Sequence, residues 1–230
     1  MAETTTLLGM TLPGTGDAAD ITQLNTNFSN IEEYLQTYVA STGIGRNARA
    51  VDTLDDAKKF GLYLSNVGVP PIEGKVYWVA LVMPHNTTAT MVQIAYRSTS
   101  NPTQFATRRM TDGVWGDWEY INPPLKAGVE YRTTERWNGK PVYRKYVSYV
   151  TTNQGADGTI SGINIPHGIT DMENIIRCAG KIGAYLLPYM STSGGLTMVS
   201  QYTSANIMVR TNGTWSGERT WHFDLAYTKE

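Results

Sequence analysis

Residues 17–40, DAADITQLNTNFSNIEEYLQTYVA, decide how this chain is organised. Its large apolar side chains follow one another at intervals of 3, 4, 3, 4 and 3 residues: Ile21, Leu24, Phe28, Ile31, Leu35 and Tyr38. This is the heptad spacing of a coiled-coil helix, and most of the other positions are polar. A single helix of this length with so polar a surface is barely stable in water. The pattern therefore predicts a seam shared between chains.

The residues of this seam favour three chains over two. Leu35 falls at an a position and Ile31 at a d position, a combination that shifts coiled coils towards trimers. Asp17, followed three residues later by Asp20, suits the start of the helix. We expect a parallel trimeric stem about 27 Å long, from the rise per residue of an α-helix. The alternative is that the seam packs against the β domains of the same chain.

The composition argues against several classes of function. The chain has 230 residues, a net charge of −1 and 17% charged residues, whereas nucleic-acid-binding surfaces are strongly basic. No apolar run has the length of a membrane span, and the N-terminus does not resemble a signal peptide. We therefore expect synthesis in the cytoplasm, no membrane insertion and no nucleic-acid partner. The single cysteine, Cys178, gives no internal disulfide.

Beyond residue 60 the sequence is typical of a mainly β protein. About eight short apolar or alternating runs are separated by turn residues, which indicates a β-sandwich or jelly roll. Asp112-Gly113 and Asn138-Gly139 are favoured hairpin corners. One face of the last predicted strand consists of large apolar side chains: Trp221, Phe223, Leu225 and Tyr227. Their alternation with smaller or polar residues predicts a half-buried strand.

Three local predictions concern the segment before residue 100. TLDDAKKFG, at 53–61, is expected to form a short helix capped by Thr53 and stopped by Gly61. The apolar run KVYWVALV, at 75–82, suits a strand covered on both faces. MVQIAYR, at 91–97, predicts a strand with Gln93 on the opposite face from three apolar residues: Val92, Ile94 and Tyr96.

Motifs for catalysis are sparse. The three histidines lie in separate segments and lack the spacing of a metal site. His222 and Asp224 share a strand face, which can orient an imidazole, although the polar outer face of a sandwich strand gives the same pair. Cys178 fits a small core residue better than a nucleophile. We expect no metal, no cofactor and no enzymatic activity, while paired carboxylates from distant segments stay open as an alternative.

Surface aromatic residues are the best candidates for ligand binding. Tyr and Trp stack on sugar rings and lose little conformational entropy on binding. Trp137, Tyr202 and Trp215 fall at or near turns or strand ends, where binding surfaces are built. Arg136 directly precedes Trp137 at a predicted hairpin tip. We predict that these four residues contact a saccharide.

Three parts of the chain resemble proteins of phage tails. LPGTGDAADITQLNTNFSNIEEYL, at 12–35, resembles the N-terminal signature of tail-tip proteins from phages of Gram-positive bacteria. Residues 50–121 are similar to the pyocin-knob domain, through TLDDAKKFGLYLS, MVQIAYRSTSNPTQFATRRM and GVWGDWEYI. AGVEYRTTERWNGKPVYRKYV, at 127–147, and HGITDMENIIRC, at 167–178, resemble the C-terminal β domain of phage tail fibres and receptor-binding proteins.

This resemblance implies a homotrimeric host-recognition protein at the tail tip or baseplate of a virion, or in a phage-like bacteriocin. A tail protein would hold the N-terminus, and the C-terminal domain would bind a bacterial surface saccharide. Composition, heptad spacing and this resemblance together divide the chain into an extended arm (1–16), a trimeric coiled-coil stem (17–43), a pyocin-knob-like α+β domain (44–122) and a jelly-roll-like β-sandwich (123–230). The last boundary lies at Asn122-Pro123-Pro124, where prolines interrupt the strands. A polysaccharide-cleaving tail enzyme and a purely structural fibre component stay open as alternatives.

Overall fold

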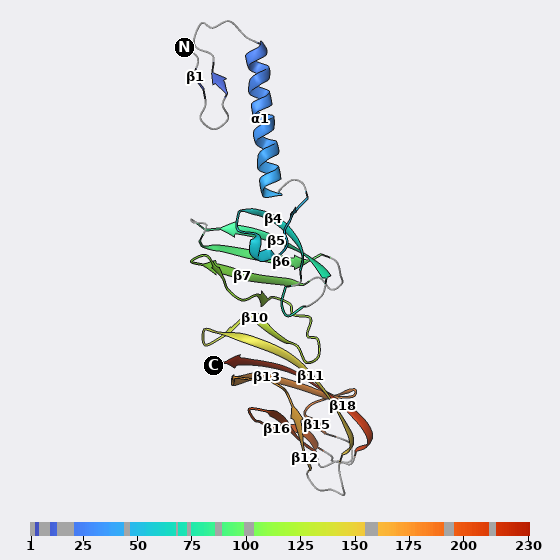
Figure 1. The fold of residues 1–230 in the computed structure, drawn as a ribbon. Coiled ribbons are helices and arrows are strands. Elements are labelled where there is room, and N and C mark those ends of the chain that lie inside the picture. The colour runs from blue at the N-terminus through green and yellow to red at the C-terminus, as the bar shows by residue number, and fades with distance from the viewer. Residues whose placement is uncertain are drawn as a thin grey trace. The chain divides into compact units, whose positions relative to one another are not determined.

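The computed structural model describes residues 3–4, 10–12, 21–43, 47–67, 69–72, 75–85, 89–98, 104–154, 161–190, 196–211 and 215–230. Within these ranges the chain is mainly β with one α-helix, so the coarse fold class is confirmed (Figure 1). It forms two compact units, the first from residues 1–68, 74–99 and 109–116, and the second from 69–73, 100–108 and 117–230. The two units interleave along the sequence, and the four predicted domain ranges stay predictions.

The predicted stem forms the helix α1 (Ile21–Thr42). Gly43 ends it with a φ of 70°, and its N–H donates to the carbonyl of Val39 at 2.9 Å. Glycine tolerates this left-handed conformation, which makes it the usual residue after a helix. The predicted capping residues Asp17 and Asp20 lie outside the described residues.

The N-terminal arm is described only in part. Two short strands, β1 (Glu3–Thr4) and β2 (Thr11–Leu12), pair antiparallel with each other. The remaining residues of the predicted arm, apart from Met10, lie outside the described part of the chain. The expectation that the arm binds a tail protein stays a prediction.

The helix predicted over residues 53–61 is much shorter in the structure. It is a single 3-10 turn, η1 (Leu54–Asp56), closed by a capping box between Thr53 and Asp56. The Thr53 cap is confirmed, but Gly61 does not stop a helix; it begins a strand instead. A Cβ on Gly61 would lie 2.2 Å from the carbonyl oxygen of Thr42, so only glycine lets the end of α1 approach so closely.

The first unit contains a sheet in the order β3 (Arg49–Ala50), β4 (Gly61–Val67), β5 (Lys75–Pro84) and β6 (Met91–Arg97). β3 runs parallel to β4, and the other pairs are antiparallel. The large inner residues Tyr63, Trp78 and Met91 are buried. β5 was expected to be covered on both faces. Its residues instead alternate between buried and partly exposed positions, and Tyr77 is 45% exposed.

β6 turns its glutamine towards the inside. Met91, Gln93 and Ala95 are buried, whereas Ile94 and Tyr96 are 39% and 40% exposed. The predicted separation of Gln93 from the apolar face is confirmed. The Gln93 amide donates to the carbonyls of Leu54 and Ala57 at 2.7 and 3.1 Å. The Leu54 carbonyl also accepts from the Ala57 N–H at 3.3 Å, so an apolar side chain at position 93 would remove a donor from both carbonyls and leave the Leu54 carbonyl with its backbone partner.

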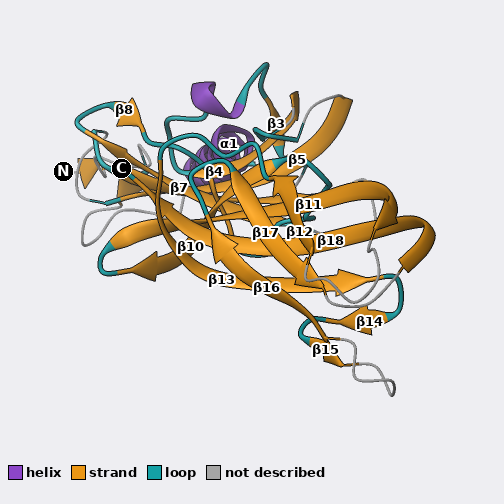
Figure 2. Cartoon of the chain, turned by 90° about the horizontal axis from the view of Figure 1, so that it is seen from below, coloured by secondary structure: helices purple, strands orange, loops and turns teal. Residues whose placement is uncertain are grey.

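The second unit consists of two sheets (Figure 2). The larger contains, in spatial order, the first half of β7 (Phe105–Thr111), β9 (Glu119–Tyr120), β10 (Glu130–Trp137), β11 (Lys140–Gln154), β18 (Trp215–Lys229), β13 (Met172–Ile182) and β14 (Tyr185–Leu186). The smaller has the order β12 (Ser161–Pro166), β17 (Asn206–Thr211), β16 (Leu196–Tyr202) and β15 (Tyr189–Met190). The second half of β7 belongs to the first unit and forms a hairpin with β8 (Val114–Trp115).

The two sheets of the second unit share one apolar core. β18 contributes four fully buried side chains, Trp221, Phe223, Leu225 and Tyr227. Residues of the smaller sheet complete the cluster, among them Ile163, Ile165, Ile207 and Val209. The predicted apolar face of the last strand is therefore confirmed, and side chains of both sheets contribute to one core.

Both predicted hairpin corners are present. Asp112 and Gly113 have φ values of 51° and 81°, and Asn138 and Gly139 have 48° and 79°. Two successive residues with positive φ form the type I′ turn that matches the twist of antiparallel strands. The corners join β7 to β8 and β10 to β11.

Candidate functional site

The seam of α1 is exposed along its length. Four of its large side chains are 44–61% exposed: Leu24, Phe28, Leu35 and Tyr38. Ile31 is half-buried, and the side chain of Ile21 lies outside the described residues. The alternative, in which the seam packs on the β domains of the same chain, requires these side chains to be covered. The described part of the chain does not cover them.

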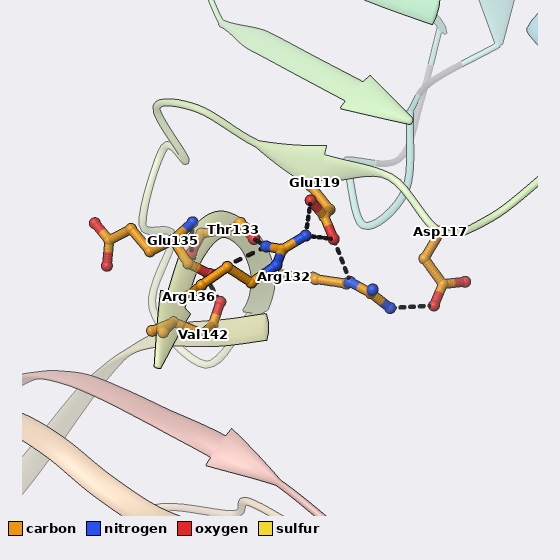
Figure 3. Close-up of polar contacts among 7 residues, drawn as sticks. All are labelled: Asp117, Glu119, Arg132, Thr133, Glu135, Arg136 and Val142. Carbon is orange, nitrogen blue, oxygen red and sulfur yellow. Dashed lines mark hydrogen bonds and ion pairs between the residues drawn. The ribbon is translucent and has the colours of Figure 1, made fainter. Parts of the chain in front are cut away.

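Four charged side chains, the arginine cluster, meet between β9 and β10: Asp117, Glu119, Arg132 and Arg136 (Figure 3). The Glu119 carboxylate, 14% exposed, accepts from Arg132 Nε at 3.0 Å. Arg136 Nη2 donates to both carboxylate oxygens of Glu119, each at 2.8 Å. Arg132 Nη1 also pairs with Asp117 at 2.7 Å. The two guanidinium groups offset the cost of burying the Glu119 carboxylate.

A β-bulge aims Arg136 at Glu119. The register of β10 on β11 shifts between Arg132 and Arg136, and bulges of this kind redirect side chains. Arg136 Nη1 donates to the carbonyls of Thr133 and Glu135, at 3.2 and 3.1 Å. Both terminal nitrogens of Arg136 are therefore engaged within the chain. Its role as a saccharide contact stays a prediction.

Trp137 ends β10 and is 48% exposed. It pairs with Lys140 across the hairpin turn. The Lys140 ammonium donates to Glu173 at 2.6 Å, and this hydrogen bond lowers the pKa of Glu173. An accessible indole beside charged groups is the combination that stacks on one face of a sugar and hydrogen-bonds its hydroxyls.

Tyr202 in β16 is 39% exposed, and its hydroxyl interacts with the thiol of Cys178 in β13. Burial raises the pKa of Cys178 to about 11 and that of Tyr202 to about 12. Both groups are therefore protonated at neutral pH, and Cys178 is a weak nucleophile, in agreement with its expected place near the core. The contact links the two sheets of the second unit.

Trp137 in β10 and Tyr202 in β16 lie in different sheets of the second unit. Strand pairing places Trp137 at the level of position 140 of β11 and the backbone of Trp215 at the level of 154. These two levels are separated by about 46 Å along an extended strand. The side chain of Trp215 lies outside the described residues.

Sequence reasoning missed a hollow of about 520 Å³ in the first unit. Its lining combines an exposed aromatic ring with carboxylate and amide groups, from Asp52, Asp56, Asn66 and Tyr77. These residues come from three segments that only the pairing of β3, β4 and β5 brings together. The sequence carries no local signal for this hollow.

The residues considered for catalysis are engaged elsewhere. Arg144 and Arg177 bind the carboxylate oxygens of Asp224, and the ring of His222 stacks on Tyr146 with centroids 5.6 Å apart. Burial lowers the pKa of His222, and Lys181 lowers it further. Among the described residues, no group of His, Cys, Asp and Glu is arranged to hold a metal ion. No helix of the described chain is long and apolar enough to span a membrane.

No protein-family model and no curated protein matches the chain. Among solved structures, it is similar to a C-terminal part of the R1 pyocin fibre of P. aeruginosa, with 7% identity, 84% of this chain and 70% of that chain covered, and a TM-score of 0.29. The N-truncated R2-type pyocin tail fibre shares 12% identity, with 77% and 94% covered and a TM-score of 0.23. TM-scores of this size do not establish a common fold.

Proposed function

We propose that the chain is a homotrimeric host-attachment protein of a phage tail or phage-like bacteriocin, which binds a bacterial surface saccharide without cleaving it. The observation that carries the proposal is the exposed seam of α1. Phe28 is 61% exposed and Leu35 54%, although both recur at heptad spacing on one side of a helix. Three parallel copies of α1 would bury these side chains against one another.

The attachment role follows from the resemblance of the sequence to phage tail proteins and from the form of the candidate contacts. Trp137 and Tyr202 are accessible aromatic residues in different sheets of the second unit. A single shallow aromatic contact binds a sugar weakly, with a dissociation constant of about 1 mM. Three copies on one stem bind more tightly, because after the first contact the others form within one complex.

The trimer is tested by light scattering on the full chain at micromolar concentration, with two variants of α1. Phe28→Asp places a carboxylate at a seam position, and Ser29→Asp places the same group on the adjacent exposed position. We expect about three times 25.4 kDa for the unaltered chain and for Ser29→Asp, and one chain for Phe28→Asp. An unaltered chain that stays monomeric would overturn the proposal.

Attachment is tested by the binding of labelled protein to bacterial cells. Trp137→Ala removes the accessible indole, and Tyr185→Ala removes an aromatic ring of similar exposure from β14. We expect Trp137→Ala to lower cell binding about tenfold and Tyr185→Ala to leave it unchanged, with the same mass for both. Reducing ends released from the envelope polysaccharide would favour the cleaving enzyme instead.

A further inference from the structure

The outer face of the sheet in the first unit is apolar across three strands. We call nine side chains the outer apolar face: Leu62, Leu64, Tyr77, Val79, Leu81, Met83, Val92, Ile94 and Tyr96. Strand pairing aligns them in rows, such as Leu62 with Leu81 and Ile94. None of the nine is charged. The face is therefore continuous and not a set of isolated apolar residues.

The described chain leaves this face accessible. Tyr77, Ile94 and Tyr96 are 39–45% exposed, and the other six side chains are partly exposed. The inner face of the same strands is buried, with Trp78 and Met91 inaccessible. An antiparallel sheet with one face in water normally carries polar residues on that face. A contiguous apolar surface on a folded protein marks a site of interaction.

The end of α1 connects the seam to this sheet. Thr42 comes four residues after Tyr38, so it continues the heptad spacing, and it is buried where Gly61 begins β4. A Cβ on Gly43 would lie 2.7 Å from the carbonyl oxygen of Leu62. The side chain of Leu62 belongs to the outer apolar face. The end of the seam therefore lies against the first residues of β4, the strand that carries Leu62 and Leu64 of this face.

A hydrogen bond holds this connection. Arg49 Nη1, from β3, donates to the carbonyl of Ser41 at 2.6 Å and so ties the last turn of α1 to the edge of the sheet. The Arg49 guanidinium also lies 5.4 Å from the centre of the Tyr63 ring in β4. Within one chain, α1 ends against β4. Copies of α1 that share the seam therefore bring the β4 strands of their chains towards a common axis.

From this continuity we propose that the outer apolar face is covered by a second copy of the chain, in the trimer whose stem is α1. The proposal rests on the trimer of the proposed function and adds the surface on which the β regions of the three copies meet. Apolar, uncharged contact surfaces are typical of permanent homo-oligomers. An unrelated partner would not be positioned on the face by the seam.

The test uses cysteine labelling of the full chain with a maleimide. Ile94→Cys introduces a thiol on the outer apolar face, and Val114→Cys introduces one on β8, outside the nine residues of this face. The native Cys178 reacts slowly, because burial raises its pKa to about 11. In a single chain the two introduced positions are 39% and 70% exposed, so their rates differ little. Tyr96→Cys replaces Ile94→Cys if the latter does not fold.

In the trimer we expect the thiol at position 94 to react about tenfold more slowly than the thiol at 114. Adding Phe28→Asp to separate the chains should restore its rate. Equal rates in a chain of trimeric mass would overturn the covered face and leave the trimer standing. Protection that persists in the separated Phe28→Asp chain would also overturn it, because something other than a second copy then covers the face. A monomeric unaltered chain overturns the proposed function instead.

Discussion

In both β6 and β18, large apolar residues occupy alternate positions. These side chains are buried in β18, whereas in β6 they lie on the exposed face. β18 turns Trp221, Phe223 and Leu225 into the core of the second unit. β6 turns Ile94 and Tyr96 outward and its polar Gln93 inward. β18 faces a second sheet whose buried side chains are mostly apolar, whereas the inside of β6 faces carbonyls of the η1 turn. Which face of a strand is buried therefore depends on the layer packed against it.

The largest effect should come from truncating the buried side of β18. Trp221 is inaccessible, and its Nε1 donates to Thr151 Oγ1 at 2.9 Å. Trp221→Ala should lower the free energy of unfolding by about 3–5 kcal/mol, because it leaves a large cavity. Guanidinium unfolding measures this, with Trp221→Phe as a control that retains most of the ring. A loss below about 1 kcal/mol would contradict the assignment of β18 to the core.

The stability of the chain should depend on the side-chain amide of Gln93, on the inner side of β6. Gln93→Leu removes the donor for the carbonyls of Leu54 and Ala57. We expect a loss of about 1–3 kcal/mol in the free energy of unfolding, because the Ala57 carbonyl loses the amide donor and the Leu54 carbonyl keeps only the bond from the Ala57 N–H. Gln201→Leu, on the exposed side of β16, is the matched control and should change little. An unchanged stability for Gln93→Leu would remove the physical reason given for the orientation of β6.

Cys178 in β13, the strand beside β18, should make the free energy of unfolding fall at alkaline pH. Cys178 pairs with Leu225, and burial raises its pKa from 9.0 to about 11. Since the folded state holds the proton more tightly, the contribution of Cys178 is complete below pH 9 and is lost between pH 9 and 11. We expect the unaltered chain to lose about 1–2 kcal/mol more than Cys178→Ala over this window.

This difference reports the thiol together with its partner Tyr202, whose pKa is raised by burial and further by Cys178. Lys145, whose pKa is lowered by burial, titrates in both chains, and its effect cancels in the comparison. Urea unfolding at pH 8 and at pH 10.5, on both chains, gives the two differences in stability. An identical pH dependence would show that Cys178 is as accessible in the folded chain as in the unfolded chain.

The smallest effect on unfolding should come from the outer side of β6. In the separated Phe28→Asp chain, Ile94→Ser should change the free energy of unfolding by about 0.5 kcal/mol or less, because the side chain is partly in water. In the trimer the same change should weaken association, which dilution followed by light scattering measures. A loss above about 2 kcal/mol in the separated chain would place Ile94 in the chain's own core and end the contrast with β18.

Several features of this protein follow from the sequence alone. The heptad spacing of residues 21–38 predicted α1, and Asp112-Gly113 and Asn138-Gly139 predicted two hairpin corners. The alternation around Phe223 predicted a strand with a buried face. These features depend on backbone periodicity and on the φ values that particular residues accept, so neighbours in the sequence are enough to specify them.

Other features were decided only by the tertiary structure. Residues 53–61 form one short turn, because Gly61 has to approach the end of α1 and cannot extend a helix. Arg136, predicted to contact a saccharide, is bound by Glu119, a residue 17 positions away. Trp137 and Tyr202, both near predicted turns, lie in different sheets of the second unit. Such contacts depend on strand register and on the packing of layers, which bring distant segments together. No local sequence pattern therefore predicts them.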